Sequence, residues 1–134
     1  FSDRRFPRYL KREAYIYIYD MAKERERHYD GDTLEIDILA FGKTKDNLKV
    51  ALIIEVKTTM GSRVINQLNT KIEKFPKFFE DYKDYPIIGV VAGFKYTEVI
   101  RKEIENAGFY VLIPSGNIVK IANSPEFKPK VFNV

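Results

Sequence analysis

The chain contains no cysteine, no tryptophan and a single histidine, His28. The absence of cysteine excludes disulfide bonds and thiolate zinc sites. A single histidine excludes metal sites built from several histidines and any relay that needs two of them. A metal bound by this chain would therefore be held by oxygen ligands, which favours Mg²⁺, Mn²⁺ or Ca²⁺.

Long apolar runs and a strong excess of one charge are also missing. No apolar run approaches the roughly 20 residues of a membrane helix, and no secretory signal pattern is visible. We therefore expect no membrane partner and a cytoplasmic location. The net charge of +4 permits a nucleic-acid partner without requiring one.

The composition is that of a globular protein, with 45% apolar and 31% charged residues. The length favours a single domain spanning residues 1–134. The first residue is Phe1 and not methionine, so we expect the chain to be cut from a longer protein.

The pattern of apolar residues predicts a sheet. Period-two alternation is typical of half-buried strands. The continuous apolar run at 87–92 is typical of a strand that is covered on both faces. The predicted strands cover residues 14–21, 34–41, 49–57, 87–92, 109–113 and 118–121.

Helical signals separate the later strands. Ser62 is a candidate N-cap for a helix that Pro76 should end or bend. Thr97 can cap a second helix, and Gly108 should end it. Residues 1–13 predict a short basic helix whose beginning is expected upstream. The order of elements predicts an α/β fold, in which a mixed central β-sheet is flanked by helices.

Charged residues interrupt two of the most apolar predicted strands. Glu35 and Asp37 share one face of the first strand, because residues two apart in a strand point the same way. Glu55 and Lys57 share a face of the second strand for the same reason. A hairpin folded at 45–47 would place Asp37 opposite Glu55, with Glu35 opposite Lys57. Opposed Cβ atoms lie about 4.5–5.5 Å apart, close enough for two carboxylates to hold one cation.

These side chains supply the parts for phosphodiester hydrolysis. A cation would relieve the repulsion between Asp37 and Glu55, polarise a phosphoryl oxygen and generate hydroxide. Lys57 would stabilise the developing charge or position the attacking water. The alternative is an ordinary cross-strand pair between Glu35 and Lys57 on a solvated face, with both other carboxylates exposed. A slip of one residue would also take Asp37 off the shared face.

The segments Glu35-Ile36-Asp37-Ile38-Leu39 and Glu55-Val56-Lys57-Thr58-Thr59 resemble the motif of the PD-(D/E)XK nuclease superfamily. This superfamily includes restriction endonucleases and archaeal Holliday junction resolvases. The whole arrangement, including the ending Phe127-Lys128-Pro129-Lys130, also resembles prokaryotic nuclease-like proteins in which this domain often follows a coiled coil. The resemblance implies a restriction-endonuclease-like core and a metal-dependent DNA endonuclease. It implies Mg²⁺ or Mn²⁺ as cofactor and DNA as partner, and it leaves a homodimer open.

The resemblance also implies roles for individual residues. Asp37 and Glu55 would bind the metal together with the carbonyl of Val56. Lys57 would be the catalytic cation. Gln67 matches a helix glutamine that some relatives use in catalysis, with a solvated helix face as the alternative.

One group of the superfamily pattern has no clear counterpart. Many members carry a glutamate on their first helix, and Glu13 is the only nearby candidate. The true counterpart could lie upstream of Phe1 or be absent. The alternative function is therefore a catalytically inactive nuclease-like domain that binds nucleic acid or protein and is attached to a coiled coil.

Overall fold

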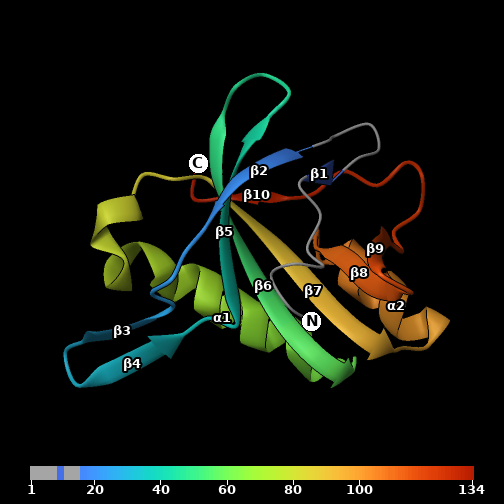
Figure 1. Ribbon diagram of the computed structural model, residues 1–134. Helices are drawn as coiled ribbons and strands as arrows, with labels where there is room; N and C mark the ends of the chain where they lie inside the picture. Colours follow the sequence, from blue (N-terminus) through green and yellow to red (C-terminus); the bar gives the residue numbers. More distant parts are fainter. Residues whose placement is uncertain (1–8, 11–15) are drawn as a thin grey trace.

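The computed structural model describes residues 9–10 and 16–134 (Figure 1). The helices are α1 (Arg63–Phe78) and α2 (Glu98–Asn106), with a short 3-10 helix η2 (Glu80–Tyr82) between them. The strands are β1 (Tyr9–Leu10), β2 (Ile16–Met21), β3 (Glu26–Tyr29), β4 (Asp32–Glu35), β5 (Ile38–Thr44), β6 (Lys49–Thr59), β7 (Ile87–Lys95), β8 (Tyr110–Ser115), β9 (Ile118–Ile121) and β10 (Val131–Phe132).

Within the described residues, one sheet runs in the order β1-β2-β5-β6-β7-β8-β9, with β10 beside β7. β3 and β4 form a separate two-stranded ribbon. β5 pairs antiparallel with β6, whereas β6–β7 and β7–β8 are parallel pairs. The parallel pairs are joined through α1 and α2, because a parallel connection needs a crossover. The predicted α/β class with a mixed central sheet is confirmed.

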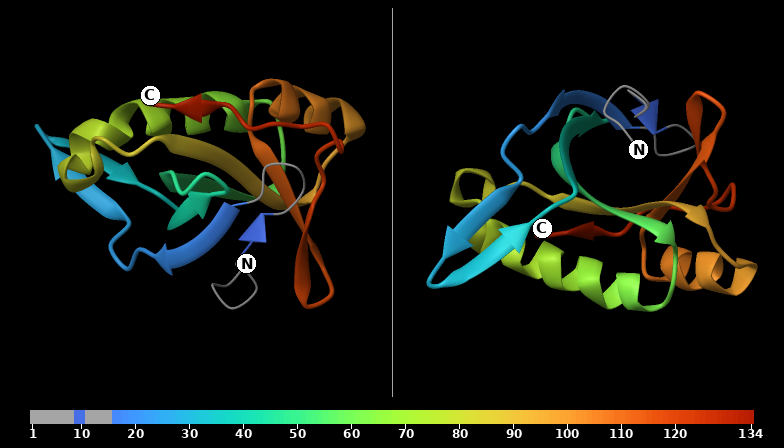
Figure 2. Two further views of the ribbon diagram at one scale, coloured as in Figure 1. Left: turned by 90° about the horizontal axis from the view of Figure 1, so that it is seen from above. Right: turned by 60° about the horizontal axis from the view of Figure 1, so that its bottom comes forward.

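Both helices lie on the same side of the curled sheet (Figure 2). Leu68 of α1 and Ile104 of α2 are buried in one apolar cluster with Ile53 of β6. On the opposite face, Leu52 of β6 packs in a second cluster that includes Phe127 from the C-terminal segment. The central strands are therefore covered on both faces, but helices from the described residues cover only one of them. No helix in this part of the chain is long and apolar enough to cross a bilayer.

The helix α1 continues through Pro76 to Phe78, so the prediction that Pro76 would end or bend it near Phe75 is wrong in its boundary. Phe75 is fully buried, and its ring stacks on that of Phe79 with 4.9 Å between centroids. The N–H of Phe79 also donates to the carbonyl of Phe75 at 2.8 Å. Burying each such side chain is worth roughly 1.5–3 kcal/mol, which outweighs the single helical hydrogen bond that proline cannot make.

The predicted helix over residues 1–13 is contradicted at Tyr9–Leu10, which form strand β1. Their backbone pairs with β2, Tyr9 opposite Tyr17 and Leu10 opposite Ile16, so this piece of chain extends the edge of the sheet. The remainder of that prediction, including Glu13, lies outside the described residues.

The predicted strand over 34–41 is two strands in the structure, β4 and β5, which are separated at Ile36 and Asp37. The N–H of Ile36 donates to the carbonyl of Arg25 at 2.8 Å. This bond takes the chain away from the sheet ladder and into the β3–β4 ribbon. The alternation of buried Leu34, Ile36 and Ile38 continues across the break, so the apolar pattern alone carries no sign of it.

Candidate active site

The register of β5 and β6 places Asp37 beside Glu55. Ile38 pairs with Ile54 and Leu39 with Ile53, which confirms the register predicted for this hairpin. Asp37 and Glu55 are each one residue beyond the Ile38–Ile54 pair, at the point where β5 begins. The two carboxylates therefore lie at the same end of the ladder.

The end of the strand pairing frees the backbone of Val56. In a continuing ladder Val56 would pair with Ile36, but the N–H of Ile36 donates to Arg25 instead. The N–H of Val56 donates to Oδ2 of Asp37 at 2.8 Å. Because the N–H and C=O of one strand residue point to the same side, the Val56 carbonyl also faces the side of Asp37.

Arg25 stabilises the break in the ladder through two contacts, one made by its side chain and one by its backbone. Its Nη1 donates to the carbonyl oxygen of Asp37 at 2.6 Å, and its own carbonyl accepts from Ile36. The backbone of Asp37 is thus fixed while its carboxylate turns to Val56. Sequence reasoning missed Arg25, because it lies within a charged run that is typical of a solvated surface.

Glu55 is the buried charge of the site, with 5% of the residue exposed. Its Oε2 lies 2.8 Å from Nζ of Lys71 on α1, and its Oε1 lies 3.8 Å from Nζ of Lys57. The Lys71 contact does not have hydrogen-bond geometry, so Oε2 has no hydrogen-bond partner among the described residues. Burying a carboxylate is costly unless it is paired, and the two ammonium groups supply that pairing. The alternative in which Glu55 lies on a solvated face is therefore wrong.

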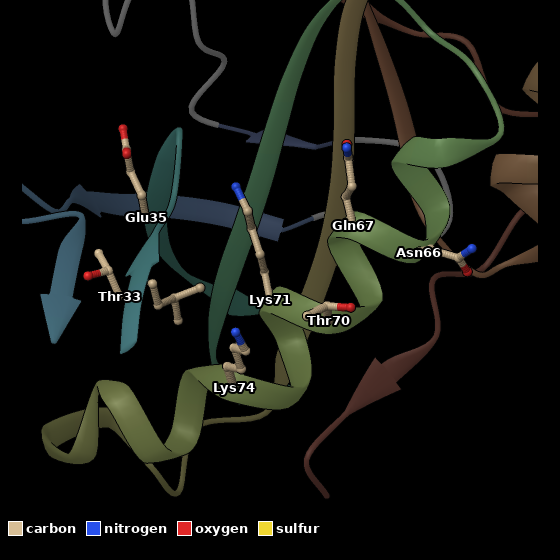
Figure 3. A pocket seen from close by; sticks show the side chains of 8 residues that line it. Thr33, Glu35, Asn66, Gln67, Thr70, Lys71 and Lys74 are labelled. Atoms are coloured by element: carbon tan, nitrogen blue, oxygen red, sulfur yellow. The ribbon is translucent and has the colours of Figure 1, made fainter. Parts of the chain in front are cut away.

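The extended hairpin predicted that Glu35 would lie opposite Lys57. The structure does not place it there. Glu35 pairs with Glu26 in the β3–β4 ribbon, because the chain leaves the ladder between β4 and β5. Its side chain lines a cavity of about 440 Å³ between this ribbon and α1. The residues that line this cavity are Thr33, Leu34, Glu35, Asn66, Gln67, Thr70, Lys71 and Lys74 (Figure 3).

Gln67 lies on the wall of the same cavity. Lys71 follows it by one helical turn, so the two side chains share a face of α1. Figure 3 shows the Lys71 side chain between those of Glu35 and Gln67. No hydrogen bond within the described part of the chain joins Gln67 to Asp37 or Glu55. Gln67 therefore shares the cavity wall with Lys71, and it is Lys71 that contacts Glu55.

The oxygen donors at this site are of the chemical kind that a divalent cation such as Mg²⁺ takes. Among residues 9–10 and 16–134, no three His, Cys, Asp or Glu side chains come together as a metal site. Asp37, Glu55 and the Val56 carbonyl could supply three oxygen ligands. Mg²⁺ is commonly held by one or two carboxylates and keeps several waters. The buried Oε2 of Glu55, which lacks a hydrogen bond, is the structural feature that favours a cation here.

Comparison with known proteins finds only distant structural similarity. No family model matches the chain, and no curated protein matches its sequence. A repair endonuclease from Pyrococcus abyssi matches 66% of this chain at 19% identity, with a TM-score of 0.39. EndoMS in its apo form matches 73% at 17% identity, with a TM-score of 0.37. The match spans 38% and 41% of those two chains, and similarity at this level does not define a family.

Proposed function

We propose that this chain is a metal-dependent DNA endonuclease that hydrolyses phosphodiester bonds. The observation that supports this proposal is that Asp37 and Glu55 lie one residue beyond the last pair of the β5–β6 ladder, with the Asp37 carboxylate on the N–H of Val56. Lys57 lies two residues beyond Glu55, on the same face of β6. Two acids and a lysine on adjacent strands are the groups that this reaction needs at one place.

Each residue has a role that its position supports. Asp37 and Glu55 hold one Mg²⁺ or Mn²⁺ together with the carbonyl of Val56. When bound, the cation supplies Lewis-acid polarisation of the scissile phosphodiester. The Lys57 side chain is 33% exposed, so its ammonium can face a phosphate while it remains near Glu55. It positions the attacking water or stabilises the charge that develops on the phosphate.

Gln67 and the two threonines after Lys57 complete the proposed site. Gln67 lines the same cavity as Lys71, which contacts Glu55, and it can donate its amide hydrogens to a substrate. Thr58 and Thr59 are exposed at the end of β6, where their hydroxyl groups are free to meet a DNA strand. The net charge of +4 is compatible with this partner.

A second function is favoured by the small number of acidic ligands. The described residues offer two carboxylates and no third, and the candidate Glu13 lies outside them. A domain of this kind could bind nucleic acid or a protein without cutting. The two functions differ in what happens to bound DNA when a divalent cation is added.

The test is cleavage of single-stranded, duplex and branched DNA with Mg²⁺ or Mn²⁺, and with a chelator as control. We expect the wild-type protein to cut only when the cation is present. Asp37→Asn and Lys57→Ala should abolish cutting, whereas Asp46→Asn in the exposed β5–β6 loop should retain it. Cutting that survives both site substitutions would overturn the site assignment. Cation-independent binding without cutting would favour the second function.

A further inference from the structure

The ammonium of Lys71 occupies the oxygen of Glu55 that a metal would otherwise use. Nζ lies 2.8 Å from Oε2, and the Lys71 side chain is only 23% exposed. The contact lacks hydrogen-bond geometry, so it is held by charge and confinement. A protein cation therefore already neutralises the buried carboxylate.

A divalent cation and this ammonium compete for the same place. Lys57 and Lys71 already place two ammonium groups against the single carboxylate of Glu55, at 3.8 and 2.8 Å. A divalent cation would bring two further positive charges to this residue, which is only 5% exposed. Metal–oxygen bonds are roughly 2.0–2.6 Å long, so the metal must also approach Glu55 more closely than the ammonium does. Repulsion between the two cations then favours departure of Lys71.

A second carboxylate, that of Glu35, lines the same cavity as Lys71. The Lys71 side chain lines the cavity of about 440 Å³ whose opposite wall carries Glu35. Glu35 is exposed and has no ion pair in the described part of the chain. The long, flexible lysine side chain extends from α1 between Glu35 and Gln67 (Figure 3). Lysine has a flexible four-carbon stem, and Lys71 and Glu35 line the same cavity.

We propose that Lys71 is a displaceable internal cation of the site, which holds Glu55 before a metal binds and moves toward Glu35 when a divalent cation takes its place. This inference rests on the proposed function, since it assumes that Asp37 and Glu55 receive the cation. It adds a positioning residue and a carboxylate that the motif does not contain. It also predicts that metal affinity is set partly by the cost of moving Lys71.

Calorimetric titration with Mn²⁺, without DNA, tests the competition. Lys71→Met removes the competing charge and should bind Mn²⁺ roughly tenfold more tightly, because close charge pairs couple by more than 1 kcal/mol. Glu35→Gln removes the alternative partner and should bind Mn²⁺ more weakly than the wild type. Lys74→Met is the matched control: Lys74 follows Lys71 by one turn and pairs with Asp32 at 2.9 Å, away from Glu55.

A second measurement needs no substitution. Brief acetylation of the wild-type protein, read by mass spectrometry, compares the reactivity of Lys71 with that of Lys74 in the same sample. Addition of Mg²⁺ should raise the Lys71-to-Lys74 ratio severalfold, because the ammonium leaves its buried pairing. This measurement decides the question if Lys71→Met does not fold.

The outcomes separate this inference from the proposed function. If the wild-type protein binds Mn²⁺ but Lys71→Met binds it equally or more weakly, Lys71 is not displaced and the inference is wrong. An unchanged Lys71-to-Lys74 ratio at saturating Mg²⁺ would also overturn it. If neither the wild type nor Lys71→Met binds a divalent cation, the metal-dependent function itself fails.

Discussion

The N–H of Val56 donates to Oδ2 of Asp37 at 2.8 Å, at the place in the sheet where Val56 would otherwise pair with Ile36. The same break that removes a backbone partner therefore delivers a carboxylate to the strand that carries Glu55. An unpaired strand end is costly unless its polar groups find other partners. Here the proposed metal ligand is also the structural cap of the β5–β6 ladder.

This double role predicts different results for two substitutions of Asp37. Asp37→Asn keeps an oxygen that can accept from Val56 but removes the charge. It should leave stability nearly unchanged and lower cleavage by at least about 10²-fold, the upper range for groups that only support metal ligands. Asp37→Ala should lose the same activity and, in addition, about 1 kcal/mol of stability. Urea denaturation and a cleavage assay measure the two effects. Equal stability of both variants would contradict the capping role.

Arg25 should control the metal affinity of the site without touching the metal. Its Nη1 holds the carbonyl of Asp37, so Arg25→Ala should release the backbone that aims this carboxylate. We expect Mn²⁺ affinity to fall by roughly 10–100-fold, as for other groups that orient metal ligands. Arg25→Lys should restore part of it. Calorimetric titration provides the measurement.

The control for Arg25 is Arg27, which lies two residues further along the chain in β3. Arg27 pairs with Asp81 at 2.9 Å, and its guanidinium lies over the ring of Phe79. Arg27→Ala should loosen the ribbon from the segment of Phe79 and Asp81 that follows α1, and it should lower stability while Mn²⁺ affinity changes less than in Arg25→Ala. If both variants lose the same Mn²⁺ affinity, the affinity depends on docking of the whole ribbon and not on the contact between Arg25 and Asp37.

Two glycines should respond in opposite ways to an added methyl group. A Cβ on Gly89 of β7 would lie 2.5 Å from the buried ring of Phe109. Gly89→Ala should therefore cost roughly 1–3 kcal/mol, as overpacked cores do. A Cβ on Gly61, before α1, meets nothing within 4 Å, so Gly61→Ala should be neutral or slightly stabilising. Thermal denaturation compares the pair, and an unaffected Gly89→Ala would contradict the packing of the Phe109 ring against β7.

The C-terminal segment should loosen from α2 at acid pH. Glu105 of α2 accepts hydrogen bonds from the backbone N–H of Ser124 at 2.6 Å and from its hydroxyl at 2.9 Å. Burial opposes ionisation of Glu105, but these bonds and the charge of Arg101 together lower its pKa below the ordinary value of 4.5. Ionised Glu105 therefore contributes its full stabilisation of the folded protein above pH 4.5. This contribution is lost as the pH falls through the lower pKa that Glu105 has in the folded protein.

Glu105→Gln is the matched variant for this pH dependence. It should be less stable than the wild type by about 1 kcal/mol at neutral pH. The difference should shrink as the pH falls below 4.5, because the wild-type carboxyl then loses its charge. Urea midpoints at several pH values measure this. A difference that does not change with pH would show that the charge of Glu105 contributes nothing.

The sequence predicts the β5–β6 hairpin well because its information is local. The loop at 45–47 is short, and Asn47 adopts a positive φ of 65° that suits a tight turn. With the turn in place, the length of the loop fixes the register of the two strands. The position of Asp37 and Glu55 at the same end of the ladder follows from this hairpin.

The roles of Arg25 and Lys71 could not be predicted from the sequence, because the residues that they contact are distant in sequence. The charged run that contains Arg25 has the pattern of a surface ribbon, and its bond to the Asp37 carbonyl exists only after the ribbon folds back. Lys71 lies on a helix face where lysine is ordinary. The one available signal was its spacing of one turn after Gln67, on the helix that follows the Glu55 strand.

The most direct test of the central claim is calorimetric titration of Mn²⁺ into the wild-type protein, Asp37→Asn and the loop control Asp46→Asn. If Asp37 and Glu55 form one cation site, the wild type and Asp46→Asn should each bind one Mn²⁺, and Asp37→Asn should lose this binding. Binding of Mn²⁺ by Asp37→Asn with wild-type affinity and stoichiometry would contradict the claim.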